Sequence, residues 1–190
     1  NQTVRVVSTT DMTQKDSFSA AIGEIRGVAY GTDGFIYAAA QGGTVQKINA
    51  STLISVGVFS GHTGPVNAVV ASADGFIYSA GDDGSVRKID PSDMSQSGVF
   101  SGHTGAVLSL AAGPSGDVFS GGSDETVRKI DTTDMSQAGI FDDLTDSVLS
   151  LAYSHNGNLF AGYASAKILK LNPSTMAEVD RFNGVTSTQS

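Results

Sequence analysis

The sequence has no cysteine and no tryptophan, and its aromatic residues are few. Without cysteine, neither disulfide bonds nor thiolate metal sites can stabilise the fold. No apolar run approaches the length of about 20 residues that a membrane span needs. Sugar rings stack on aromatic faces, and the chain offers only 5 tyrosines and no tryptophan for this purpose. These absences exclude a disulfide scaffold and a membrane-spanning helix, and they weigh against a carbohydrate-binding protein.

Basic residues are also scarce. The 190 residues include 11 Lys and Arg against 19 Asp and Glu, which gives a net charge of -8. Nucleic acids and anionic membrane surfaces attract basic proteins, because their phosphates need neutralising cations. We therefore expect neither a nucleic acid nor a membrane among the partners.

A period of 41 residues runs along the chain without insertion or deletion. It places one phenylalanine in each copy, at Phe18, Phe59, Phe100, Phe141 and Phe182. Residues 59–99 match residues 100–140 at 22 of 41 positions. A fixed period of this length is typical of solenoids and propellers, in which each unit stacks on the next.

Each copy contains four short segments of strand character. In the third copy they are residues 106–111, 117–120, 126–130 and 137–141. The turn between the first two holds Asp33-Gly34, Asp74-Gly75, Ser115-Gly116 and Asn156-Gly157 in successive copies. Glycine accepts the positive φ that tight hairpin turns require. We label the four strands a to d, and their spacing leaves no room for helices.

The pattern predicts an all-β protein, a β-propeller with four complete four-stranded blades and an N-terminal half-blade made of strands c and d. The predicted array occupies residues 1–182, with a polar C-terminal tail at 183–190. Its units are the half-blade 3–18 and the blades 19–59, 60–100, 101–141 and 142–182.

Two copies carry a recognisable motif. Gly61-His62 and Gly102-His103 open them, and Ile89-Asp90 and Ile130-Asp131 stand near their ends. The chain therefore resembles the WD40 family, whose repeat runs from Gly-His to Trp-Asp, with isoleucine in place of tryptophan. The resemblance implies two buried polar networks, one of His62, Ser79 and Asp83 and one of His103, Ser120 and Asp124. The pattern is absent from the first copy, with Ala21 and Gly42, and from the fourth, with Leu144 and Ser165.

A histidine, a serine and an aspartate together also suggest a hydrolase, because this trio activates a serine nucleophile. The same trio occurs twice at identical spacing, and no motif supplies an oxyanion hole or a nucleophile elbow. We therefore interpret both trios as structural and expect no catalytic residue.

Two further charge patterns are candidate binding sites. Asp142, Asp143 and Asp146 replace the Gly-His-Thr-Gly loop in the fourth copy, which makes the loop a candidate for calcium. Its spacing matches no EF-hand, so we interpret these carboxylates as solvated loop charge and expect no metal. A lysine also recurs in strand c, at Lys47, Lys88, Lys129 and Lys170. We interpret these lysines as packing between blades, with ammonium groups reaching solvent or acids such as Asp90 and Asp131, in preference to a cationic ring for an acidic partner or a sialylated glycan.

The two ends of the array are unequal. The first residue is not methionine, and strands a and b of the N-terminal unit are missing, so we expect a segment of a longer propeller. Alternatives are a five-bladed ring with one thin blade, or two chains paired through the open strand around Val4 and Val6.

The function that these patterns favour is a non-enzymatic, WD40-like protein-binding or scaffold module without a cofactor, either alone or as part of a larger assembly. Its partner is another protein or a second copy of the chain. The alternative is a lectin-like propeller that binds glycan at repeated sites between blades. The abundance of Gly, Ser and Thr favours an extracellular or virion-associated setting.

Overall fold

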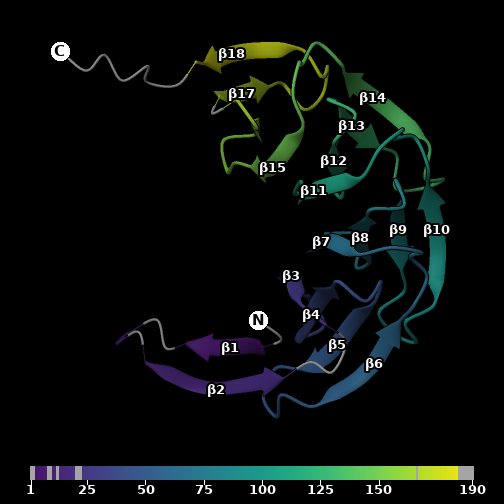
Figure 1. Cartoon of the computed structure of the whole chain (residues 1–190), viewed down its shortest axis with the longest axis vertical. Coiled ribbons are helices and arrows are strands. Elements are labelled where there is room, and N and C mark those ends of the chain that lie inside the picture. Colours follow the sequence, from purple (N-terminus) through teal and green to yellow (C-terminus); the bar gives the residue numbers. More distant parts are fainter. Residues whose placement is uncertain (1–2, 8–9, 12, 20–22, 166, 184–190) are drawn as a thin grey trace.

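The computed structural model describes residues 3–7, 10–11, 13–19, 23–165 and 167–183, and all regular elements in these ranges are β-strands (Figure 1). Across these ranges, no helix has the length and apolar character that a membrane crossing requires. The strands form one two-stranded and four four-stranded sheets, and neighbouring strands within every sheet are antiparallel.

We call the pair of β1 (Thr3–Val7) and β2 (Gln14–Ser19) the N-terminal sheet and the other sheets blades 1 to 4. Blade 1 consists of β3 (Ile25–Tyr30), β4 (Phe35–Ala40), β5 (Val45–Asn49) and β6 (Ser55–Phe59). Blade 2 consists of β7 (Val66–Ala71), β8 (Ile77–Gly81), β9 (Val86–Ile89) and β10 (Gln96–Phe100). Blade 3 consists of β11 (Val107–Ala112), β12 (Val118–Gly122), β13 (Val127–Ile130) and β14 (Gln137–Phe141). Blade 4 consists of β15 (Val148–Tyr153), β16 (Leu159–Tyr163), β17 (Lys167–Leu171) and β18 (Glu178–Phe182).

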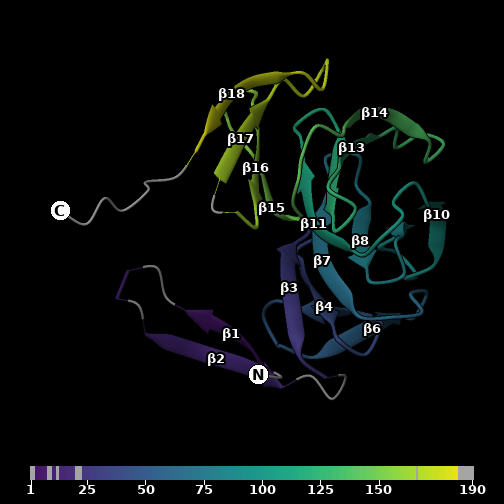
Figure 2. The ribbon, with the colours of Figure 1, turned by 45° about the horizontal axis from the view of Figure 1, so that its top comes forward.

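The blades stand side by side in an open arc. The first strand of each blade lies on the inner side and the last on the outer rim, as Figure 1 shows for β7 and β10. The N-terminal sheet and blade 4 lie at the two ends of the arc, and they remain apart in a second view (Figure 2). This arrangement confirms the predicted all-β propeller of four complete blades and one half-blade. The strands of the four blades span residues 25–59, 66–100, 107–141 and 148–182, and β2 ends at Ser19.

The turns between the first and second strands have the predicted glycine geometry. Gly34, Gly75, Gly116 and Gly157 adopt φ values of 82°, 86°, 90° and 75°. Any side chain at these positions would strain the backbone, because residues that have a Cβ atom rarely adopt positive φ. The turn glycines therefore set the hairpins that start each blade.

The hydrophobic core is divided among the joints between sheets. We call the side of a sheet that faces the next sheet in chain order its front face, and the opposite side its back face. One apolar cluster fills each of the four joints, from the N-terminal sheet and blade 1 to blades 3 and 4. In the second joint, for example, Val45 and Phe59 of blade 1 pack on Ile89 and Met94 of blade 2. Each blade is thus stabilised mainly by its neighbours, as in other repeat arrays.

Candidate functional site

The first polar network joins a loop to β8 and to the turn that follows β8 in blade 2. His62 lies in the loop between β6 and β7, with Nε2 2.9 Å from the Oγ of Ser79 on β8. Its Nδ1 lies 3.0 Å from both carboxylate oxygens of Asp83. The same carboxylate accepts hydrogen bonds from the Thr63 backbone N–H at 3.1 Å and from the Ser85 hydroxyl at 2.7 Å. The imidazole and the Ser79 hydroxyl are fully buried, so the network ties the entry loop to the blade.

The second network repeats the first in blade 3. His103 Nε2 lies 2.8 Å from Ser120 Oγ, and Nδ1 lies 2.8 Å and 3.0 Å from the two oxygens of Asp124. Thr126 takes the place of Ser85 and donates to Asp124 at 2.9 Å. The structure thus brings together all six residues that the family resemblance assigned to these networks.

Burial sets the protonation of both networks. It lowers the pKa of His62 and of His103 below the ordinary value of 6.5, although the neighbouring carboxylate pulls each upward. Burial raises the pKa of Asp83 and Asp124, but the hydrogen bonds that each accepts outweigh this and leave it below the ordinary 3.8. A neutral imidazole then donates its Nδ1–H to an ionised carboxylate and accepts from the serine hydroxyl at Nε2.

This order of donors is also that of a catalytic triad, but the position of the serine differs. Ser79 and Ser120 lie within the second strand of their blades with no exposed surface. A nucleophile has to reach the substrate carbonyl, and a buried hydroxyl inside a sheet cannot. The chemistry that the arrangement supports is hydrogen bonding within the blade.

Blade 4 fills the corresponding place with an apolar side chain. Leu144, one period after His103, is buried in the cluster between blades 3 and 4, while Ser165, one period after Asp124, is exposed. In blade 1 the position of the histidine is Ala21, which lies outside the described residues. The loop that leads into blade 4 is therefore held by apolar packing, whereas the corresponding loops of blades 2 and 3 are held by hydrogen bonds.

A second set of polar contacts, not anticipated from the sequence, lies at the turns between first and second strands. In blade 1 the Tyr37 hydroxyl donates to Asp33 at 2.6 Å, and Lys47 Nζ lies 2.8 Å from the same carboxylate. Lys47 also donates to the carbonyl of Pro91 in blade 2 at 2.7 Å, and its ammonium lies 4.0 Å from the Phe35 ring centre. The lysine therefore crosses the joint between the two blades.

Blade 2 has the same contacts. Tyr78 donates to Asp74 at 2.6 Å, and Lys88 lies 3.1 Å from Asp74 and donates to Thr132 of blade 3 at 2.7 Å. Blade 3 differs, because Lys129 lies 3.0 Å from Asp117, two residues further along the turn. Lys47 and Lys88 thus reach the next blade, and the ion pairs of Lys47, Lys88 and Lys129 are with acids of the turns, Asp33, Asp74 and Asp117.

The acidic loop at the start of blade 4 does not form a compact cluster. Asp142 and Asp143 are exposed and Asp146 is half-buried. Among the described residues, no group of three or more His, Cys, Asp or Glu is arranged to hold a metal ion. The geometry gives no support to calcium binding at this loop.

The open strand β1 contributes to the first joint. Val4 is buried against Ala38, Ile48 and Leu53 of blade 1, while the side chain of Val6 lies outside the described residues. In the part of the chain that the structure describes, β1 pairs only with β2. Pairing of two chains through this edge stays a prediction, and Val4 also has a role inside the arc.

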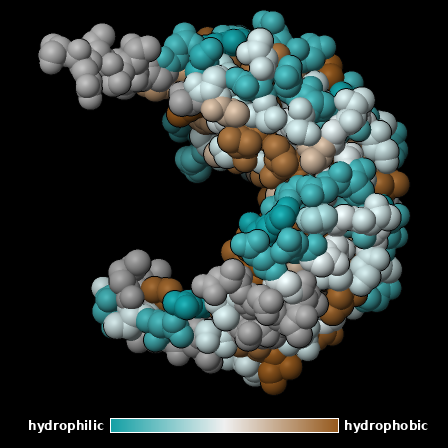
Figure 3. Space-filling view, in the orientation of Figure 1, coloured by the Kyte–Doolittle hydropathy of each residue, from teal (hydrophilic) through white to brown (hydrophobic). Residues whose placement is uncertain are grey.

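An apolar groove lies on the turn side of the arc, and we call it the inner groove. It has a volume of about 500 Å³ and lies where β7, β11 and β15, the innermost strands, reach their turns. Its walls include Ala73, Ala112, Pro114, Tyr153 and His155. The Tyr153 ring stacks on Phe119 at 5.9 Å between centroids, which fixes that wall. In Figure 3 apolar side chains gather along the inner side of the arc near β11 and β15.

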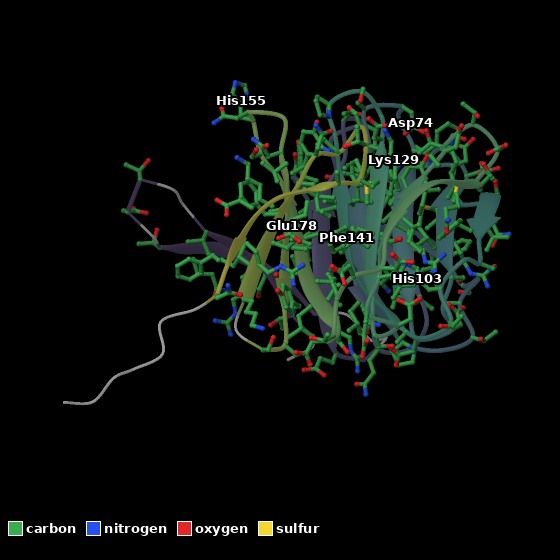
Figure 4. The ribbon with its side chains drawn as sticks, turned by 90° about the horizontal axis from the view of Figure 1, so that it is seen from above. Asp74, His103, Lys129, Phe141, His155 and Glu178 are labelled. Carbon is green, nitrogen blue, oxygen red and sulfur yellow. The ribbon has the colours of Figure 1, made fainter. Side chains whose placement is uncertain are left out.

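The inner groove and the histidine networks lie toward opposite ends of the strands. Figure 4 shows His155 on the same side of the arc as Asp74 and Lys129, whereas His103 lies toward the other side. The polar networks therefore stabilise one side of the arc, and the groove opens on the other.

Comparison with known families agrees with this geometry. The family model described as WD domain, G-beta repeat matches residues 53–90 and 94–131, which overlap the two copies with histidine networks. No curated protein sequence matches the chain. With its repeated four-stranded antiparallel sheets, the chain is a WD40-like β-propeller repeat protein. Repeats of this family generally serve as protein-interaction or scaffold modules and are typically non-enzymatic.

Proposed function

We propose that this chain is a non-enzymatic protein-binding module that holds an apolar side chain of its partner in the inner groove. The observation that carries the proposal is the groove itself. Small residues of blades 2 and 3 line the groove together with Tyr153 and His155 of blade 4. A concave apolar site bordered by a few polar groups is the usual form of a recognition pocket.

The rigidity of the groove supports this role. Its walls come from three blades whose joints are filled by apolar clusters, and Tyr153 is held by its stacking on Phe119. A site on a rigid scaffold loses little conformational entropy when it binds, so more of the contact energy appears as affinity. We expect an extended peptide segment of the partner with one aliphatic or aromatic anchor.

Absence of catalysis is part of the proposal. Its support is the full burial of Ser79 and Ser120 and the use of their histidines in hydrogen bonds within the blades. The acidic net charge supports a protein ligand over a polyanion.

The test is a selection from a random peptide display library against the purified chain. Binding of selected peptides is then compared with binding to Ala73→Arg, which places a long charged side chain in the groove. Asn156→Arg is the matched control, since it adds the same side chain to an exposed turn position that does not line the groove. We expect Ala73→Arg to weaken binding roughly tenfold or more and Asn156→Arg to leave it unchanged. Equal binding to all three proteins, or no selected peptide, would overturn the proposal.

The alternative of glycan binding between blades has less support. A groove of about 340 Å³ between blades 1 and 2 includes Phe35 and Lys47. The Lys47 ammonium already covers the Phe35 ring at 4.0 Å, which leaves that face less available to a sugar. Repeated binding on a glycan array, unaffected by Ala73→Arg, would favour this alternative.

A further inference from the structure

Blade 4 has an uncovered front face. In blades 1 to 3 the front face includes a valine on the third strand and a phenylalanine at the end of the fourth, and both are buried by the next blade. Val45, Val86 and Val127 are 0% exposed, and Phe59, Phe100 and Phe141 are 4% to 9% exposed. The equivalent residues of blade 4, Ile168 and Phe182, are 47% and 58% exposed. Among the residues that the structure describes, no sheet packs on this apolar face of blade 4.

At the other end of the arc, an apolar residue on the back face of the N-terminal sheet is exposed. Val7 on β1 occupies the repeat position of a buried apolar residue on the back face of every blade, namely Ile48, Ile89, Ile130 and Leu171, which are 0% to 1% exposed. Val7 itself is 43% exposed. Arg5, on the same strand, is also exposed. The N-terminal sheet therefore has a covered front face, where Val4 packs on blade 1, and an open back face.

We infer that the front face of blade 4 binds the back face of the N-terminal sheet of a second copy of this chain. All four joints in the arc obey one rule, in which a front face packs on the back face of the following sheet. The two unused faces are one front and one back, so they complement each other by the same rule. They lie at opposite ends of an open arc and do not meet within one copy (Figures 1 and 2).

This contact is head-to-tail. Each copy keeps one free face after the first contact, so two copies can close a ring and more copies give an open filament. The interface continues a packing mode already present four times in the chain, and it does not depend on the inner groove.

Polar residues of the front face set the strength of the contact. Lys47 and Lys88 each donate to a carbonyl of the following blade, whereas Lys170 has no hydrogen bond or ion pair among the described residues and can donate across the new joint. Asp180, in contrast, weakens the contact between the two copies. It stands at the repeat position of Gly57, Gly98 and Gly139, on which a methionine of the next blade packs. A charged side chain there disfavours the methionine contact, so the joint is weaker than those inside the arc.

The experiment is sedimentation velocity of the full chain over a range of concentrations, with variants at both ends. We expect reversible association that Phe182→Asp and Val7→Asp each weaken roughly tenfold or more. Asp180→Gly restores the glycine of the other blades and should strengthen association. Val99→Asp, at an exposed valine on the rim of blade 2, is the matched control and should have no effect.

Mixing the two end variants gives the decisive result. The intact front face of Val7→Asp can bind the intact back face of Phe182→Asp, so the mixture should form one heterodimer and nothing larger. A monomeric wild type at all concentrations would overturn the inference. So would association insensitive to Val7→Asp, which would indicate two-fold pairing of blade 4 faces, or association insensitive to Phe182→Asp, which would indicate pairing through the β1 edge.

Discussion

Gly98 on β10 lies directly beneath Met135 of the next blade. A Cβ atom at Gly98 would be 2.6 Å from the Cγ of Met135, closer than side-chain carbons approach in proteins. The same relationship joins Gly57 to Met94 and Gly139 to Met176. The three methionines adopt positive φ values of 59°, 61° and 55°, in loops closed by a backbone hydrogen bond to the residue four positions earlier. This backbone geometry directs each methionine across the joint to the preceding blade.

Gly98→Ala should destabilise the joint between blades 2 and 3. The added methyl group overpacks a filled site, and we expect a loss of about 1–3 kcal/mol in the free energy of unfolding, measured by urea denaturation. On a Met135→Ala background the same change should cost much less, because the space is then free. Equal costs on the two backgrounds would show that the two residues do not interact.

Asp74 in the first turn of blade 2 depends on the aromatic residues Phe76 and Tyr78 that follow it. We expect the residues of blade 3 to be tolerated at these positions only when all three are replaced together. Asp74→Ser removes the acceptor of the buried Tyr78 hydroxyl and the acid that pairs with Lys88, so we expect a loss of about 1–3 kcal/mol in unfolding free energy. Adding Phe76→Asp and Tyr78→Phe recreates the arrangement of blade 3 and should restore most of this loss. Urea denaturation of the single and triple variants checks the prediction, and a triple variant as unstable as Asp74→Ser would contradict it.

The buried histidines should make stability depend on pH. Their pKa values in the folded chain lie below 6.5, so the unfolded chain takes up their protons first as the pH falls. The stability contributed by the neutral imidazoles is fully present above about pH 6.5 and is lost as the pH falls through the lower pKa values of the folded chain. Asp83 and Asp124, with pKa values below 3.8, contribute stability above that pH which is lost on further acidification.

Unfolding free energy should therefore decrease as the pH falls from about 7 to about 5. The double variant His62→Gln, His103→Gln should show a shallower slope. His155→Gln is the matched control, because His155 is the third and exposed histidine of the chain, and it should keep the wild-type slope. A double variant with the wild-type slope would show that other groups cause the pH dependence.

Period and turn chemistry made most of the fold predictable from the sequence. The 41-residue step fixed the number of sheets, and the turn glycines marked the hairpins to within one or two residues, as at Gly116 between β11 and β12. The partners of His62 and His103 followed from the family resemblance, which supplied the spacing to the serine and the aspartate. Their protonation could not be predicted, because it depends on burial.

Other contacts were not predictable because the residues that make them change place between copies. The acid that pairs with the strand c lysine is Asp74 in blade 2 but Asp117, two positions further along the repeat, in blade 3. A comparison of copies position by position therefore misses it. The left-handed backbone of Met94 also has no sequence signature, since the residues that favour positive φ are glycine and asparagine.

The inner groove was missed because its residues are small and ordinary. Ala73, Ala112 and Pro114 have no polar or reactive group in their side chains. Only the curvature of the arc brings them together beside Tyr153.

Hydrogen exchange with and without a selected peptide measures the proposed function most directly. Binding in the inner groove predicts slower exchange at residues 71–73, 112–113 and 153–155, with no change in the His62 and His103 loops on the opposite side of the arc. Protection confined to those histidine loops, or to the outer rim strands, would contradict the assignment of the binding site to the inner groove.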